Sequence, residues 1–216
     1  MLKVDNINVS IGAVDILREV SIDLGTGSMV GLVGRNGAGK TTLIKSIMGL
    51  LKPKSGRIDF DGIDLAATPV NHRNRLGIGY MPEDRRLIPD LTVEENILVP
   101  AWANPEIPAE QRLQYVYDII PELREFAPRR GLQLSGGQQK LVALGRALMV
   151  GKRLLLLDEP FEGVAPALAQ RLAEVISQLK SEGMSVIFSE SDLQYSKHLV
   201  HRIFLIDRGN VSQQSI

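Results

Sequence analysis

The spacing of hydrophobic residues along the chain predicts an alternation of strands and helices. In two early segments, 2–9 and 20–24, apolar residues alternate with polar ones, so we expect an antiparallel pair of half-buried strands there. Residues 29–33 and 154–157 are instead continuous apolar runs, the second of them four leucines. Such runs are typical of parallel strands that are buried on both faces. The pattern therefore predicts antiparallel strands followed by a buried parallel sheet.

Helical spacing begins in the middle of the chain, and strands and helices alternate again after residue 158. The predicted segments are strands at 56–60, 77–81, 185–189 and 202–207, and helices at 93–98, 113–120 and 168–179. The helices in the middle interrupt an otherwise regular α/β pattern. We therefore expect one α/β domain over residues 1–216, with an N-terminal antiparallel β region and an inserted α-helical subdomain at 83–131.

Length, charge and composition exclude several classes of protein and of site. The chain has 216 residues, enough for one well-packed domain, and its lack of cysteine excludes disulfides and thiolate metal sites. The 25 Lys and Arg balance the 25 Asp and Glu, so no net basic field favours nucleic acid as a partner. There is no apolar run of the roughly 18 residues that a membrane span needs, and the chain starts with a strand pattern instead of a signal peptide. We expect a soluble, unexported protein that binds no nucleic acid.

The segment between the apolar run at 29–33 and a following helical pattern fits the phosphate-loop motif G-x-x-x-x-G-K-[ST]. Its glycines allow backbone conformations closed to other residues, and the helix N-terminus offers the positive end of its dipole to phosphates. We expect Lys40 to reach the β- and γ-phosphates of ATP, and the Thr41 hydroxyl to ligate Mg²⁺. The core is thus predicted to be a P-loop NTPase. Its phosphate-binding residues are Gly34, Arg35, Asn36, Gly37, Ala38, Gly39, Lys40, Thr41 and Thr42.

Two carboxylates follow the strand of four leucines. Asp158 ends that strand, where ligands of α/β sheets bind, and is expected to hold Mg²⁺ through water. Glu159 comes next and is placed to polarise an attacking water as general base. The pair predicts ATP hydrolysis in addition to ATP binding.

A third motif, residues 134–138, resembles the signature sequence of ATP-binding cassette (ABC) ATPases. Ser135 is expected to cap a helix, with Gln138 three residues on. The resemblance rests on all three motifs, covers nearly the whole chain and implies the ABC ATPase fold. In that family the signature binds the γ-phosphate held by the opposite subunit, so a second ABC ATPase subunit is an expected partner. The residues assigned to this contact are Ser135, Gly136, Gly137 and Gln138.

The resemblance also implies a role for the loop before the helical insertion. ABC ATPases carry a glutamine there that touches Mg²⁺ and the γ-phosphate, and this sequence has Glu83 at the matching position. A carboxylate can also ligate Mg²⁺ or orient water, whereas the alternative is a plain loop acid. The groove beside the insertion receives a short helix from a membrane subunit in the family. Integral membrane permease subunits are therefore expected partners.

The sequence departs from the family pattern at three places. The position where relatives stack an aromatic residue on adenine falls at Ile11, with Val14 expected to pack against the ribose or base edge, so we expect weaker ATP binding. Ala165 stands where many relatives have an aspartate that acts across the dimer. Ser191 stands where relatives have a histidine that contacts the γ-phosphate, and a neutral hydroxyl cannot supply imidazolium charge.

Within the family, residues 77–86 and 91–97 look most like importers of branched-chain amino acids and related amides. The chain resembles the shorter of their two ATPase subunits. The implied function is an ATP-hydrolysing importer subunit, peripheral on the cytoplasmic face of the inner membrane, in a homo- or heterodimer. Alternatives are the ATPase of a sugar, lipid or other ABC transporter, a soluble ABC protein acting on DNA or ribosomes, and a regulator with impaired hydrolysis.

Overall fold

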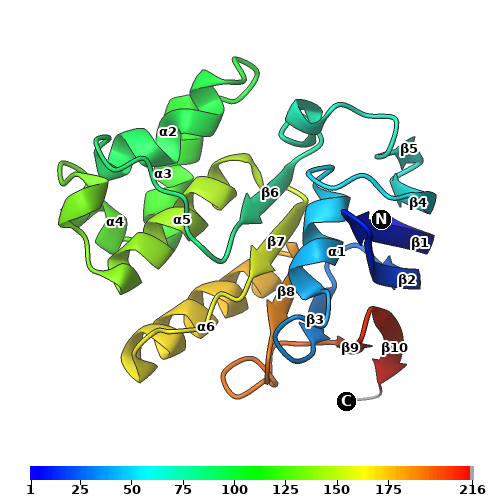
Figure 1. The fold of residues 1–216 in the computed structure, drawn as a ribbon. Coiled ribbons are helices and arrows are strands. Elements are labelled where there is room, and N and C mark those ends of the chain that lie inside the picture. The colour runs from blue at the N-terminus through cyan, green and yellow to red at the C-terminus, as the bar shows by residue number, and fades with distance from the viewer. Residues whose placement is uncertain (215–216) are drawn as a thin grey trace.

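The computed structural model describes residues 1–214 and arranges them around two β-sheets (Figure 1). The N-terminal sheet is antiparallel, with the strand order β2-β1-β4-β5. Its strands are β1 (Leu2–Ile11), β2 (Val14–Leu24), β4 (Ser55–Phe60) and β5 (Ile63–Asp64). The antiparallel pair expected from the alternating residues is therefore present, and β4 extends it.

The second sheet has the order β10-β9-β3-β8-β7-β6, and all its strands except β10 run parallel. Its strands are β3 (Met29–Val33), β6 (Ile78–Met81), β7 (Leu154–Asp158), β8 (Ser185–Glu190), β9 (Arg202–Asp207) and β10 (Asn210–Gln214). Parallel strands bring their carboxyl ends to one edge of a sheet, where ligands of α/β proteins bind. The loops that follow β3, β7 and β8 therefore meet at one edge.

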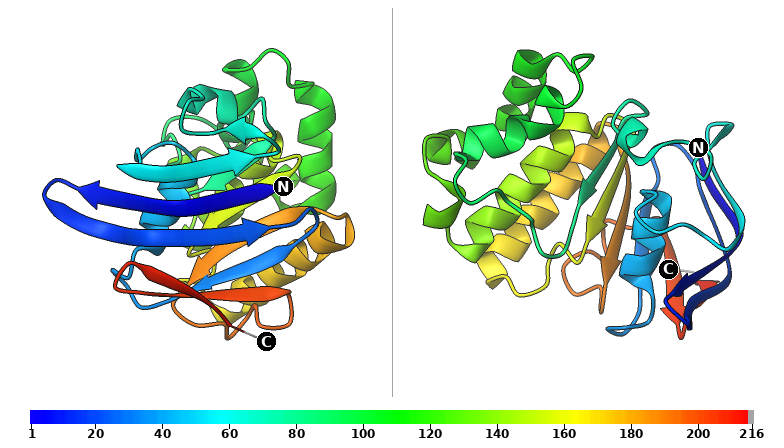
Figure 2. Two further views of the ribbon diagram at one scale, coloured as in Figure 1. Left: turned by 90° about the vertical axis from the view of Figure 1, so that its right-hand side faces the viewer. Right: turned by 45° about the horizontal axis from the view of Figure 1, so that its top comes forward.

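Helices cover both faces of the parallel sheet. Helix α1 (Lys40–Ile47) lies between the two sheets, and α5 (Gly136–Val150) and α6 (Pro166–Ser181) cover the opposite face (Figure 2). Successive side chains of a strand point to opposite faces, so the four leucines of β7 divide between two cores. Leu154 and Leu156 pack on the α1 side, and Leu155 and Leu157 pack with α5 and α6.

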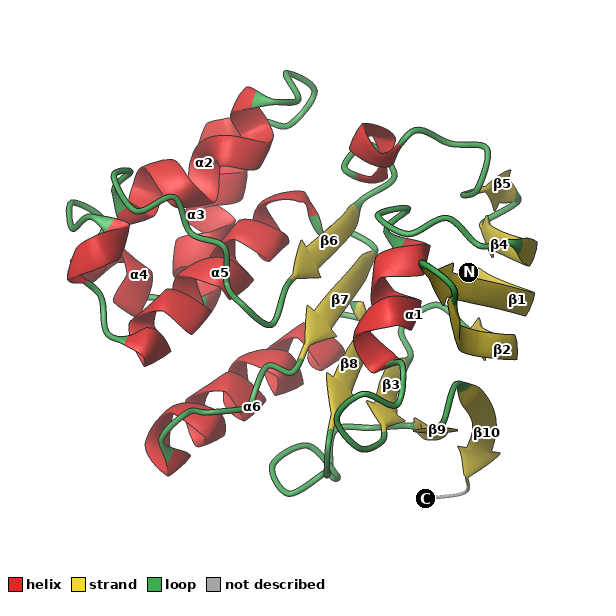
Figure 3. Cartoon of the chain, in the orientation of Figure 1, coloured by secondary structure: helices red, strands yellow, loops and turns green. Residues whose placement is uncertain are grey.

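Three short helices, α2 (Val93–Trp102), α3 (Ala109–Ile119) and α4 (Glu122–Phe126), pack around α5 (Figure 3). Gly145 of α5 permits their close approach, because a Cβ atom there would lie 2.7 Å from Leu123 Cδ1. Two 3₁₀ turns, η1 (Val70–Arg73) and η2 (Gly131–Gln133), complete the fold. The exact limits of a helical subdomain at 83 and 131 stay a prediction.

Helix α2 begins with a capping box, in which the Thr92 hydroxyl accepts from the Glu95 amide and the Glu95 carboxylate accepts from the Thr92 amide. It runs past the predicted end at residue 98 and includes Pro100. Over residues 1–214, no helix has both the length and the apolar character needed to cross a membrane.

Candidate functional site

The phosphate loop joins β3 to α1 and continues into the first turn of that helix, and six of its nine residues line a cavity of about 410 Å³. Gly37 and Gly39 have φ angles of 80° and 116°, which side chains other than hydrogen rarely allow. A Cβ atom on Gly34 would lie 2.2 Å from the Ile206 carbonyl oxygen, so the loop also needs glycine for close packing. The residues that line this cavity are Ile16, Asn36, Gly37, Gly39, Lys40, Thr41, Thr42, Glu83, Glu159 and Glu162.

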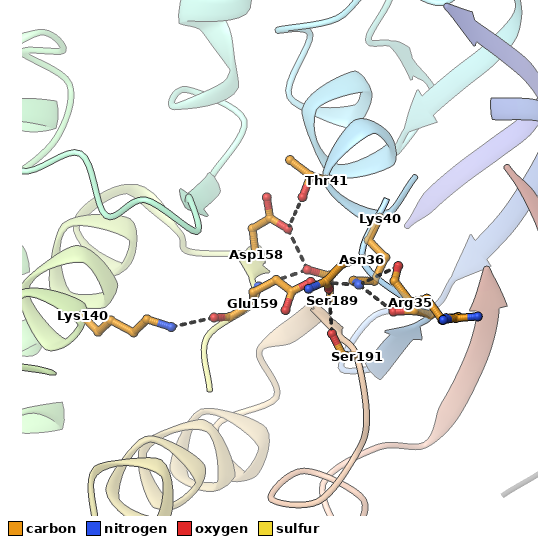
Figure 4. Close-up of polar contacts among 10 residues, drawn as sticks. Arg35, Asn36, Lys40, Thr41, Lys140, Asp158, Glu159, Ser189 and Ser191 are labelled. Atoms are coloured by element: carbon orange, nitrogen blue, oxygen red, sulfur yellow. Dashed lines mark hydrogen bonds and ion pairs between the residues drawn. The ribbon is translucent and has the colours of Figure 1, made fainter. Parts of the chain in front are cut away.

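Lys40 and Glu159 face each other in this cavity, with 2.8 Å between Lys40 Nζ and Glu159 Oε1 (Figure 4). Lys40 also donates to the Gly34 carbonyl at 2.6 Å, and both side chains are buried. Glu159 adopts a left-handed backbone conformation with φ at 52°, unusual for a residue with a side chain. Such conformations cluster at functional sites because the surrounding structure must hold them in place.

Burial is the main cause that raises the pKa of the Glu159 carboxyl to about 7. The neighbouring carboxyl of Glu162 adds to this increase, whereas the Lys40 cation opposes it. A carboxyl whose pKa lies near 7 can exchange a proton at neutral pH, which is the property a general base needs.

Asp158 and Thr41 lie together at the end of β7. Asp158 Oδ1 accepts hydrogen bonds from Thr41 Oγ1 at 3.1 Å and from Ser189 Oγ at 2.7 Å. Its other oxygen, Oδ2, is buried and has no hydrogen-bond partner among the described residues. Burial raises the pKa of this carboxyl, although the hydrogen bonds from Ser189 and Thr41 and the charges of Lys45 and Lys40 oppose the increase.

These oxygens fit Mg²⁺, which prefers hard oxygen ligands and usually keeps several waters. The unsatisfied Asp158 Oδ2, the adjacent Thr41 hydroxyl and the Glu83 carboxylate in the same cavity are donors of that kind. Within residues 1–214 no group of three or more His, Cys, Asp or Glu side chains is arranged to hold a metal by itself. A magnesium ion here would therefore depend on oxygens from a phosphate ligand and from water.

Ser191 contacts the phosphate loop directly, because its hydroxyl donates to Asn36 Oδ1 at 2.9 Å (Figure 4). It also lines a second cavity, of about 220 Å³, together with Glu159 and Glu162. The side chain is thus adjacent to the predicted phosphate site, as its place in the sequence indicates. Its role in hydrolysis stays a prediction.

The signature residues lie away from the phosphate loop. Ser135 caps α5, with its hydroxyl accepting from the Gln138 amide at 3.3 Å, while the Gln138 side chain accepts from the Ser135 amide at 3.0 Å. Ser135, Gly137 and Gln138 line a separate cavity of about 420 Å³ beside α6. One chain therefore presents two distinct surfaces, as expected if each nucleotide contacts two subunits.

Ile11 and Val14 do not line the phosphate-loop cavity. They pair at the tip of the β1–β2 hairpin and are 51% and 62% exposed. The apolar residue that lines the cavity is Ile16, which the sequence reasoning missed. Contacts of Ile11 and Val14 with a base stay predictions.

Three further residues at the site were also missed. Glu162 lines both cavities, Ser189 links Asp158 to the Glu159 amide, and Lys140 contacts the loop that carries Glu159. Ser189 had a usable signal, because it lies near the carboxyl end of the strand beside β7. Lys140 lies on a helix that precedes β7 in the chain, and no sequence pattern indicated that it would contact this loop.

Comparison with known proteins agrees with these motifs. The ABC transporter family model matches residues 17–162. The high-affinity branched-chain amino acid transport ATP-binding protein BraG of Pseudomonas aeruginosa is 35% identical, over 98% of this chain and 91% of its own. The lipopolysaccharide export system ATP-binding protein LptB of Haemophilus influenzae is 30% identical, over 98% and 88%. A solved dimeric bacterial ABC transporter cassette superposes with a TM-score of 0.88 at 25% identity, covering 100% of this chain and 98% of that one.

The family match spans the phosphate loop, the signature and the Asp158-Glu159 pair. The structural match extends over the whole chain, so the α/β fold predicted from the sequence is confirmed. The similarity to branched-chain amino acid ATPases, inferred from the motifs, is confirmed as well. The chain belongs to the family of ABC transporter ATP-binding proteins.

Proposed function

We propose that this protein is the ATP-hydrolysing subunit of an ABC importer of branched-chain amino acids or related compounds. The observation that carries the proposal is the phosphate-loop cavity, which is lined by Lys40, Glu159 and Thr41, with Asp158 hydrogen-bonded to Thr41. These are the groups that phosphoryl transfer to water requires: a cation for the phosphates, oxygens for a metal and a base for the water. The relatives named for branched-chain amino acid transport support the substrate class.

In the reaction, water attacks the γ-phosphate in line with the leaving oxygen. Lys40 exchanges its contact with Glu159 for the β- and γ-phosphates, which frees the carboxylate to accept a proton from water. Magnesium, held by Thr41, Asp158 and Glu83, would neutralise part of the phosphate charge. Asn36, which Ser191 holds at 2.9 Å, lies beside the phosphate position as part of the loop.

The proposed assembly is a pair of ATPase subunits beneath two membrane permeases, peripheral on the cytoplasmic face of the inner membrane. The separate position of the signature cavity and the dimeric assembly of a similar cassette support the pairing. Closure of the pair on two ATP molecules and its reopening after hydrolysis would move the permeases. Permease partners are supported by the transport systems of the named relatives.

The first test measures ATP hydrolysis and membrane association together. We expect purified protein to release phosphate from ATP in the presence of Mg²⁺ and to stop when EDTA removes the metal. We also expect affinity-tagged protein to recover an integral membrane permease from detergent-solubilised membranes of its host. Proteoliposomes containing that complex should accumulate labelled leucine when ATP is supplied. Recovery of no integral membrane protein would contradict the transporter assignment, and export in place of uptake would favour the lipopolysaccharide-type relatives.

A second candidate, a nucleotide-binding subunit with impaired hydrolysis, is favoured by one observation. The Ser191 hydroxyl donates its hydrogen bond to Asn36, and the side chain has no positive charge with which to bind a phosphate. In a heterodimer, this chain's own site would then be the weaker one. ATP hydrolysis near zero in the assembled complex would support this alternative.

We predict that Ser191→His raises hydrolysis by about tenfold when a second ATPase subunit is present, because an imidazolium adds a charged donor at the γ-phosphate. Phosphate release at saturating ATP checks the effect. Ser191→Ala is the matched control, since it removes the bond to Asn36 without adding a charge. If the rate of phosphate release increased equally in both variants, the cause would be the loss of the hydrogen bond to Asn36. The added imidazolium charge would then not explain the effect.

A further inference from the structure

Lys140 lies on α5, little more than one helical turn after the signature residue Ser135, and is 4% exposed. Its Nζ donates to the Glu159 backbone carbonyl at 2.8 Å (Figure 4). It also donates to two further carbonyls of the loop after β7, Pro160 at 3.2 Å and Glu162 at 2.5 Å. The signature helix and the loop that carries the proposed base are thus joined by one side chain.

The number of donors in this contact equals the number of acceptors. A lysine ammonium has three N–H donors, and three carbonyl oxygens surround it. Burial, aided by the charge of Arg85, lowers the pKa of Lys140 to about 8, while Glu162, Glu159 and Glu83 oppose that decrease. The side chain is therefore mostly charged at pH 7, with each proton engaged. Its loss would remove a charged donor from the buried carbonyls of Glu159 and Pro160 and from the partly buried carbonyl of Glu162.

The loop needs such support, because Glu159 holds a left-handed φ of 52°. The loop is also held by the hydrogen bond from the Glu159 amide to Ser189 Oγ, at 3.0 Å. Ser189 holds the amide of Glu159, and Lys140 holds the carbonyls of Glu159, Pro160 and Glu162. Both contacts hold the backbone from which the Glu159 carboxylate extends to Lys40.

The loop of Glu83 is held by the same helix. Arg85 donates to the Gly136 carbonyl at 3.2 Å, and Arg146 of α5 donates to the Arg86 carbonyl at 2.7 Å. Both segments proposed to act on this chain's own ATP are therefore attached to the helix that begins at the signature. A displacement of α5 would alter the contacts of both.

We propose that Lys140 is a positioning residue that couples the signature helix to Glu159, so that contact with the partner's nucleotide sets the placement of this chain's own base. The inference rests on the proposed ATPase function. It assigns Lys140 to the hydrolysis step and not to nucleotide binding, since its amine contacts backbone carbonyls and lies outside the residues that line the phosphate-loop cavity.

Kinetics of three variants test the proposal. Lys140→Met removes the donors, and we expect kcat to decrease by at least about tenfold, because small misplacements of a catalytic group carry such costs. The dissociation constant of ATP should stay within about twofold, since the phosphate loop is untouched. Lys140→Gln, which keeps a donor, should recover part of the rate. The control is Arg112→Met, because Arg112 likewise donates to three backbone carbonyls, at the far end of α5.

Hydrogen exchange provides a readout that does not need hydrolysis. In the nucleotide-free protein, Lys140→Met should speed exchange of the amides at residues 159–163, while Arg112→Met leaves that segment unchanged. A Lys140→Met kcat equal to that of the wild type, or unchanged exchange at 159–163, would overturn the proposal. If the wild-type protein itself hydrolyses no ATP, the proposed function fails, whereas the exchange measurement still decides whether Lys140 holds the loop.

Discussion

Replacement of Glu159 by glutamine is expected to lower kcat for ATP hydrolysis by about 100-fold or more, because general-base catalysis contributes about 10²–10⁴ to such rates. The amide is of equal size but cannot take a proton from water. ATP binding should persist, since the contact that would be lost is the one with Lys40, which the phosphates replace. Phosphate release at saturating ATP and equilibrium binding of a fluorescent ATP analogue separate the two effects.

The pH dependence of the wild-type protein provides a second check on this residue. Glu159 acts as a base only when ionised, and its raised pKa of about 7 places that transition at neutral pH. We therefore expect kcat to increase as the pH rises through about 7 and to level off above it. Glu174→Gln, which changes an exposed glutamate on α6, is the control and should leave rate and profile unchanged. An unaltered rate in Glu159→Gln would remove Glu159 from the mechanism.

Lys40→Met is expected to raise the dissociation constant of ATP by about 30- to 150-fold, which corresponds to the loss of about 2–3 kcal/mol from a charged hydrogen bond. Among the described residues that line the cavity, Lys40 has the one basic side chain, whereas Glu83, Glu159 and Glu162 have carboxyl groups. Without Lys40, a triphosphate would meet a cavity of like charge. Calorimetric titration with ATP and Mg²⁺ measures the change.

The matched control for this effect is Lys54→Met, which removes an exposed lysine whose partner is Asp15 at 3.0 Å. Exposed pairs of this kind contribute little to stability, so ATP affinity should be unchanged. An ATP affinity in Lys40→Met equal to that of the wild type would contradict the assignment of the phosphate loop.

The elements at the site were predictable from the sequence where the signal is local. The phosphate loop requires glycines at set positions between a buried strand and a helix, and all of these lie within about fifteen residues. The capping box at Ser135 and Gln138 spans four residues and formed as expected. The leucines of β7 indicated burial on two faces, which the two cores confirm.

The β1–β2 hairpin was harder to interpret from the sequence. The assignment of the base contact to Ile11 and Val14 relied on distance from the later part of β2, yet the β1–β2 pairing contains register shifts between Val4 and Ser10. Such irregularities change which residue faces a given surface. Ile16 of β2 lines the phosphate-loop cavity and Val14 does not, while the contacts of Ile11 and Val14 with a base stay predictions. No local sequence pattern predicts a register shift of this kind.

The sequence by itself determined the family, the phosphate loop and most of the strands and helices, because each motif or element depends on residues close together in the chain. The tertiary structure alone decided which distant side chains complete the site. Ser189 and Lys140 reach the Glu159 loop from 30 and 19 residues away. Such contacts depend on how β8 and α5 pack beside β7. A single serine or lysine in the sequence does not indicate which distant residue it will contact, because only that packing brings the two together.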